Sequence, residues 1–125
     1  MQSARIWSCF MLLNEKDNLQ LELILKYAAK IETYLARNGN NEQAFVNNED
    51  LHDLCCYALV QIGEAVHRLS DDFIVRHTTI DWQSLYGMRC YLVHGYESLN
   101  YRILWQAIQF DLPDLVAFCN EHYEG

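Results

Sequence analysis

Three residues in one short segment carry side chains that could process a phosphodiester: Arg89, His94 and Tyr96. Arginine stays charged at any working pH and presents a planar fork of donors that matches phosphate oxygens. Histidine accepts or donates a proton near neutral pH, which suits general acid–base catalysis. The spacing R-x-x-x-x-H-x-Y therefore indicates a phosphate-binding cation, a proton-transfer group and a phenol close together in the chain.

A regular helix through this segment would not bring the three side chains together. Seven residues separate Arg89 from Tyr96, so these two would share a helix face, whereas His94 would be rotated well away from Arg89. We expect Gly95 to adopt the left-handed conformation that ends a helix and redirects the chain. The same three residues also have ordinary structural interpretations. The histidine can complement the helix dipole, the arginine can be a solvated surface charge, and the tyrosine can be a half-buried packing residue.

Apolar residues recur at helical spacing along most of the chain, and this pattern predicts four main helices. One proline and five glycines in 125 residues favour long helices over a fold with many turns. The predicted fold class is an all-α bundle of four to five helices in a single domain, residues 1–125. The expected helices are 18–37, 47–70 with Asn47 or Asn48 as its cap, 82–93 with Asp81 as its cap, and a last one that starts at 98–100 and kinks at Pro113.

Composition excludes several other classes of protein. Five cysteines without regular spacing argue against a disulfide framework and favour a reducing, cytoplasmic setting. No cysteine or histidine pairs follow metal-ligand spacing, so we expect no metal. The apolar run 6–13 is shorter than the roughly 18 residues that a membrane helix needs, so we expect no membrane partner. Residues 1–17 are interpreted as an N-terminal extension, either a helix packed on the domain or the product of an early start codon.

The net charge of −8 is unfavourable for binding a polyanion such as RNA. The charge is unevenly distributed, however. Residues 67–102, which include the candidate cluster, contain four arginines and four acidic residues. The excess negative charge therefore lies outside the segment that would meet a phosphate.

Two motifs in the middle of the chain resemble those of the HepT-like branch of the HEPN domain family. The first is IGEAVHRLS at 62–70, and the second comprises Asp81-Trp82 and YGMR at 86–89, which runs into VHGY at 93–96. The two motifs stand in the family's order and at about the family's distance. The resemblance covers roughly residues 19–118.

The resemblance implies an all-helical, two-fold homodimer in which Arg89 and His94 of both subunits line a shared cleft. It implies a metal-independent endoribonuclease without cofactors, the toxin of a type VII toxin–antitoxin system, in which the RNA is cut by its own 2′-hydroxyl. Its partner would be a cognate minimal nucleotidyltransferase antitoxin that AMPylates Tyr96. One position departs from the family: Cys90 stands where a polar residue, most often asparagine, follows the arginine, and a thiol is a weaker donor than an amide.

Two other interpretations remain open from the sequence. The chain could be a non-catalytic HEPN module that binds a nucleotide, RNA or a nucleotidyltransferase, or a structural helical dimer. The acidic balance and Cys90 favour the non-catalytic module. Whichever interpretation holds, we expect some of the large aromatic residues of the third and fourth helices to lie on a self-associating face: Trp82, Tyr86, Tyr91, Tyr101 and Trp105.

Overall fold

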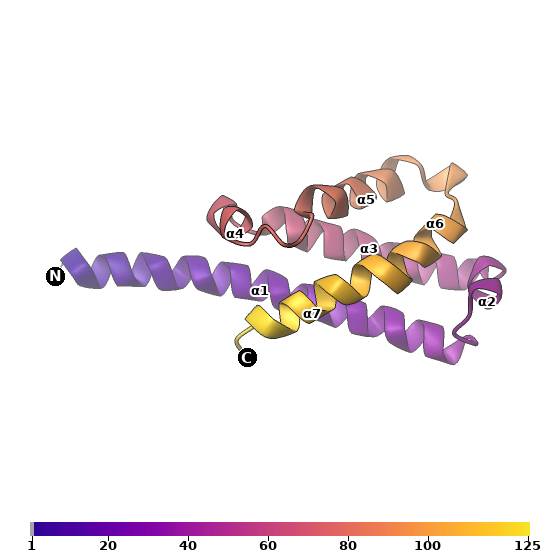
Figure 1. Ribbon diagram of the computed structural model, residues 1–125, viewed down its shortest axis with the longest axis horizontal. Coiled ribbons are helices and arrows are strands. Elements are labelled where there is room, and N and C mark those ends of the chain that lie inside the picture. Colours follow the sequence, from indigo (N-terminus) through magenta and orange to yellow (C-terminus); the bar gives the residue numbers. More distant parts are fainter. Residues whose placement is uncertain (1) are drawn as a thin grey trace.

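The chain folds into a bundle of helices in which one long helix lies along one side (Figure 1). The computed structural model describes the backbone of residues 2–125 and the side chains of residues 15–125. The described backbone contains no strand, which confirms the predicted all-α class. Its elements are α1 (Gln2–Arg37), α2 (Glu42–Val46), α3 (Glu49–Arg68), α4 (Asp71–Arg76), α5 (Trp82–His94), the 3₁₀ turn η1 (Tyr96–Ser98), α6 (Tyr101–Gln106), the π-helical turn η2 (Ala107–Asp111) and α7 (Leu112–His122).

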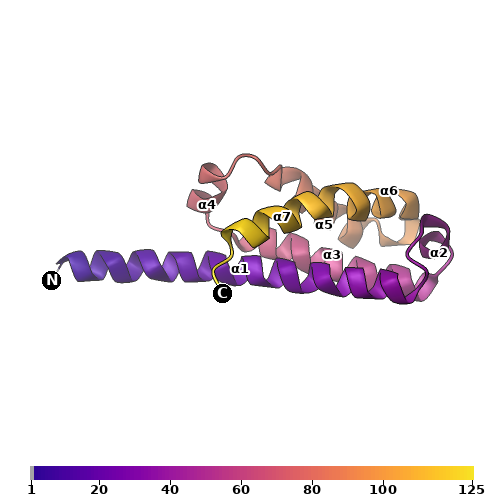
Figure 2. The ribbon, with the colours of Figure 1, turned by 60° about the horizontal axis from the view of Figure 1, so that its bottom comes forward.

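Helix α1 runs the length of the bundle, and its N-terminal part projects beyond the other helices (Figures 1 and 2). The backbone of residues 2–17 continues this helix without a break. Asp17 is buried and accepts hydrogen bonds from the backbone N–H and the hydroxyl of Ser70, at 2.8 and 2.7 Å, which ties α1 to the start of α4. The predicted apolar stripe is buried as expected: Leu21, Ile24, Ala28, Ile31 and Leu35.

The helix caps read from the sequence are present. The Asn48 side chain accepts the backbone N–H of Leu51 at the start of α3, and Asp81 accepts that of Ser84 at the start of α5. The short helices α2 and α4 fall in segments that the sequence analysis left without helices, because five or six residues are too few to show a helical period.

The last predicted helix is interrupted before Pro113 and not at it. The residues before the proline form the π-helical turn η2, and Pro113 stands in the first turn of α7. Proline has no N–H to donate to the carbonyl one turn earlier. A regular α-helix would therefore lack one hydrogen bond here, and the irregular turn η2 precedes the proline instead. The irregularity was predicted from the proline, but its position and type were not.

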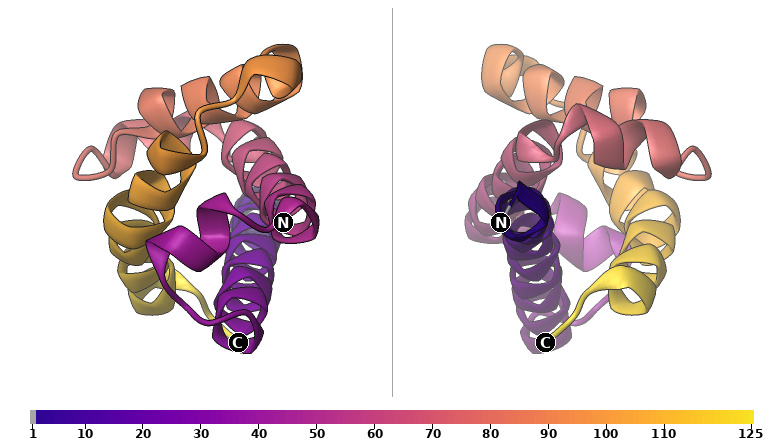
Figure 3. Two further views of the ribbon diagram at one scale, coloured as in Figure 1. Left: turned by 90° about the vertical axis from the view of Figure 1, so that its right-hand side faces the viewer. Right: turned by 90° about the vertical axis from the view of Figure 1, so that its left-hand side faces the viewer.

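The long helices surround a common interior, as the views along the bundle show (Figure 3). Helix α1 packs against α3 and α7, and α3 packs against α5. Helices α3 and α5 come into close contact at Gly63, where an added Cβ would overlap the Cβ of Arg89 and lie 2.9 Å from its Cγ. Glycine at this position therefore lets the two helices touch and determines where Arg89 lies.

Three cysteines contribute to the core as thiols. Cys55, Cys56 and Cys119 are free and buried, and burial raises their pKa to about 12, 11 and 12. They pack as small apolar side chains. Cys9 lies outside the described side chains. No helix among the described residues has the length and apolar character needed to cross a membrane.

The contact at Gly63 predicts opposite effects for two glycine-to-alanine changes. Gly63→Ala should lower the free energy of unfolding by about 1–2 kcal/mol, since overpacking outweighs the gain in helix propensity. Gly87→Ala, on the exposed side of α5 with open space around its Cα, should raise it by about 0.5–1 kcal/mol. Urea denaturation of both variants measures the difference. A Gly63→Ala protein as stable as Gly87→Ala would contradict the close contact.

Candidate active site

Arg89 lies in the middle of α5, and its side chain turns toward α3. Its Nε donates a hydrogen bond to Oε1 of Glu64, and the two side chains are 24% and 27% exposed. This carboxylate raises the pKa of the guanidinium, which stays fully charged. The guanidinium also lies 5.8 Å from the ring centre of Tyr86. The cation is thus held at the surface with its terminal amino groups left for a further ligand.

Gly95 does not adopt the expected left-handed conformation. Its φ is −110° and its ψ is 19°, and its N–H donates to the carbonyl of Tyr91 at 2.8 Å, as in a continuing helix. The predicted left-handed conformation is therefore wrong. Glycine suits this position for a different reason, since a Cβ would lie only 2.9 Å from the Tyr91 carbonyl oxygen. The chain passes directly into η1, so Tyr96 stays on the side of α5 that faces α3.

Tyr96 is bound to α3 through a second carboxylate. Its phenol donates a hydrogen bond to Oδ1 of Asp53, in the first half of α3, and the tyrosine remains 49% exposed. The bond favours the neutral phenol and raises the pKa of Tyr96 to about 12. Arg89 and Tyr96 therefore share a face, as the spacing predicts for a helix that continues past Gly95, but each has its own partner on α3.

His94 is separated from both residues within the chain. It is the last residue of α5 and is exposed, and five residues of helix rotate it by about 140° from Arg89. Among the described residues it takes part in no hydrogen bond and no aromatic contact. One chain thus presents the arginine and the histidine on different sides of the same helix and does not assemble them into one site.

Sequence reasoning missed the partners on α3. Glu64 lies inside the IGEAVHRLS motif, so the motif itself was the available signal, whereas Asp53 had none. A third pair extends the same surface: the rings of His67 on α3 and Tyr86 on α5 stack with centroids 4.3 Å apart. The candidate site is therefore a strip along the seam of two antiparallel helices.

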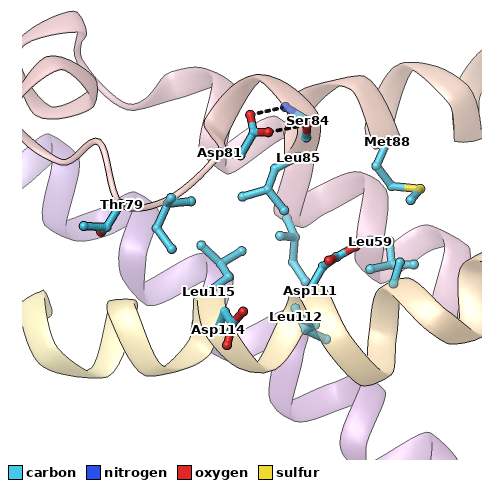
Figure 4. Close-up of a pocket in the computed structure, with 14 residues that line it drawn as sticks. Leu59, Thr79, Asp81, Ser84, Leu85, Met88, Asp111, Leu112, Asp114 and Leu115 are labelled. Atoms are coloured by element: carbon cyan, nitrogen blue, oxygen red, sulfur yellow. Dashed lines mark hydrogen bonds between the residues drawn. The ribbon is translucent and has the colours of Figure 1, made fainter.

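A cavity lies among α3, α5 and the η2–α7 segment (Figure 4). It has a volume of about 430 Å³ and mainly apolar walls. Its polar groups include the carboxylates of Asp81, Asp111 and Asp114, and negative charge of this kind repels a phosphate. Among residues 15–125, no cluster of histidine, cysteine and acidic side chains is arranged to hold a metal ion.

Several exposed apolar side chains belong to the elements that form the strip or follow it. They come from α3, from α5 and η1, and from α6: Leu54, Tyr57, Tyr91, Val93, Tyr96 and Ile103. Of the five aromatic residues expected on a self-associating face, Trp82 is buried, Tyr91 is 37% exposed and the other three are half-buried. Exposed apolar side chains of this size are typical of a surface that meets another protein when they form one patch.

Comparison with known proteins identifies the family. The family model described as "Ribonuclease HepT-like" matches residues 24–122. The chain is 36% identical over 77 residues to a Caldanaerobacter subterraneus protein named "Putative RNase", covering 62% of this chain and 69% of the relative. It is 38% identical over 58 residues to a Thermococcus cleftensis protein named "Probable ribonuclease HepT", covering 46% and 53%.

A third relative extends the match over a longer stretch. It is a Methanocaldococcus jannaschii protein, also named "Putative RNase", 29% identical over 92 residues that cover 74% of each chain. No solved structure matches the chain. The family model spans α3 and α5 with all the residues of the strip, and the chain belongs to the HepT-like ribonuclease family.

Proposed function

We propose that the protein is a metal-independent endoribonuclease toxin that acts as a homodimer, with Arg89 and His94 as its catalytic pair. The observation that carries the proposal is the charged arginine held at the surface by Glu64, on the same helix as an exposed histidine. Membership in a family of ribonucleases supports the substrate class. His94 would move the proton of the RNA 2′-hydroxyl, and Arg89 would stabilise the charge that develops on the phosphate.

Glu64 acts in this proposal as a positioning residue for Arg89. Its bond occupies Nε and leaves the terminal amino groups of the guanidinium for the phosphate oxygens. The carboxylate also weakens phosphate binding, because it neutralises much of the local positive charge. The cation is then placed precisely but does not bind RNA tightly by itself, in keeping with the acidic net charge of the chain.

The separation of Arg89 from His94 is the reason for proposing a shared site. Within one chain the two side chains leave α5 about 140° apart, so α5 does not direct both toward one RNA phosphate. A two-fold dimer through the exposed apolar residues around the strip would place the histidine of one subunit near the arginine of the other.

Regulation by a nucleotidyltransferase completes the proposal, with Tyr96 as the AMP acceptor. The exposed phenol is accessible to a transferase, and an adenylyl group adds bulk and negative charge at the end of α5 that carries His94. The phosphate of the adenylyl group would lie next to the phenol oxygen, well away from the Arg89 guanidinium of the same chain. The anchoring carboxylates Asp53 and Glu64 are eleven residues apart on α3, or about 16 Å along the helix.

The catalytic assignment predicts RNA cleavage that persists in EDTA and declines on both sides of neutral pH. His94→Gln and Arg89→Lys should each lower the rate at least about 100-fold, because they remove the proton carrier and the planar fork. Arg37→Lys, in the last turn of α1, is the matched control and should cleave like wild type. Activity that vanishes with chelator and returns with magnesium would overturn the mechanism.

The shared site predicts that two inactive variants restore each other. When Arg89→Ala and His94→Ala proteins are mixed and allowed to exchange subunits, heterodimers contain one intact site, and up to about a quarter of wild-type activity should return. Light scattering should give a dimer mass for both variants. If the mixture stays as inactive as its components while heterodimers form, the arginine and histidine of a site come from the same chain.

The regulatory assignment predicts one adenylyl group per modified chain after incubation with the cognate nucleotidyltransferase and ATP. Peptide mass spectrometry should locate it on Tyr96. Tyr96→Phe should not be labelled, whereas Tyr91→Phe, which removes another exposed phenol of α5, should be labelled like wild type. Label on a different residue would exclude Tyr96 as the acceptor.

A further inference from the structure

We propose that Asp53 prepares Tyr96 for modification by orienting its phenol and accepting the phenol proton during adenylyl transfer. This inference rests on the proposed regulation by a nucleotidyltransferase. It begins from the hydrogen bond that the Tyr96 hydroxyl donates to Oδ1 of Asp53. Both side chains are exposed, so a transferase and its nucleotide can approach without a rearrangement of the bundle.

Tyr96 differs from the other tyrosines of the described chain in its partner. It is the only tyrosine among residues 15–125 whose phenol donates a hydrogen bond to a carboxylate. Tyr57, which is 61% exposed and thus more accessible, lies against the ring of Tyr27. Tyr91 accepts a hydrogen bond from the backbone N–H of Asn100. Accessibility alone would favour Tyr57, whereas the carboxylate singles out Tyr96.

The chemistry of transfer needs a proton acceptor at this position. A phenol with a pKa of about 12 is almost entirely neutral at pH 7, so attack by a pre-formed phenolate is rare. In the step we propose, the Tyr96 oxygen forms a bond to the α-phosphorus of ATP, the bond from that phosphorus to the bridging oxygen breaks, and pyrophosphate leaves. The phenol proton passes to Oδ1 of Asp53 as the new bond forms.

Neither of the two other side chains that raise the pKa of Tyr96 can replace Asp53. Cys56 on α3 has a pKa raised to about 11 by burial and by Asp53, and Tyr101 on α6 has a pKa raised by burial. Both contribute to the high pKa of Tyr96, and both are neutral at pH 7. Asp53 is therefore the base that the fold places against the hydroxyl.

Two measurements test the pair, the first without any transferase. The difference between the ultraviolet titrations of wild type and Tyr96→Phe isolates the ionisation of Tyr96, which should occur near pH 12. In an Asp53→Asn background the same difference should move down toward the ordinary value of about 10, because the acceptor has lost its charge. A transition already near the ordinary value in wild type would show that the bond is absent in solution.

The second measurement is the initial rate of AMP transfer as a function of pH. Asp53→Asn should be modified at least about tenfold more slowly than wild type at pH 7, since the base is lost. The gap should close toward pH 10, because the variant forms about 100-fold more phenolate than wild type at a given pH when its pKa is two units lower. Asp50→Asn, one helical turn earlier on the exposed side of α3, is the matched control.

Each alternative has its own result. An equal loss of rate at every pH would mean that Asp53 only holds the segment in place, and this would overturn the role as base. Faster transfer to Asp53→Asn at pH 7 would mean that the carboxylate suppresses modification, which would also overturn it. A wild-type chain that is not labelled at all would refute the proposed regulation, whereas the titration would still report on the Asp53 pair.

Discussion

The close contact of α3 and α5 at Gly63 is the constraint on which the candidate site depends. Because no side chain stands between the helices there, the stem of Arg89 lies directly on the α3 backbone, and its guanidinium reaches Glu64. The two helices run antiparallel, so the end of α5 lies against the beginning of α3, where Asp53 meets Tyr96. One helix–helix contact thus positions both ends of the reactive segment.

This seam divides the charges between the two helices. Helix α3 supplies the carboxylates of Glu64 and Asp53, whereas α5 and η1 supply the cation and the phenol. Each functional group is held by a charged partner, which costs it rotational freedom but gives it a defined direction. In a chain of net charge −8, the phosphate binding that we propose for Arg89 would depend on this positioning and not on the overall charge.

Family membership and geometry bear on different parts of the function. The family establishes the class of protein, a HepT-like ribonuclease. The geometry adds that Arg89 and His94 leave the same helix in different directions, with exposed apolar side chains beside them. The shared site that we propose would account for both observations at once, because residues separated within a chain can come together across an interface between two subunits.

The sequence alone determined the all-α class, the four main helices, the cap at Asp81, and Asn48 as one of two candidate caps. These features follow from periodicity and capping, which act between residues a few positions apart. The helices α2 and α4 were not predicted, because five or six residues are too few to show a helical period. The conformation of Gly95 was not predicted either, because it depends on a single backbone contact with Tyr91.

Only the tertiary structure decided the partners of the reactive residues. Glu64 and Asp53 stand 25 and 43 residues before the side chains that they bind. Which residues of α3 face α5 depends on the crossing and register of the two helices, and these are set by packing around Gly63 and the core. Local spacing indicates which side of a helix is apolar, but it carries no information about which residue of another helix will lie opposite.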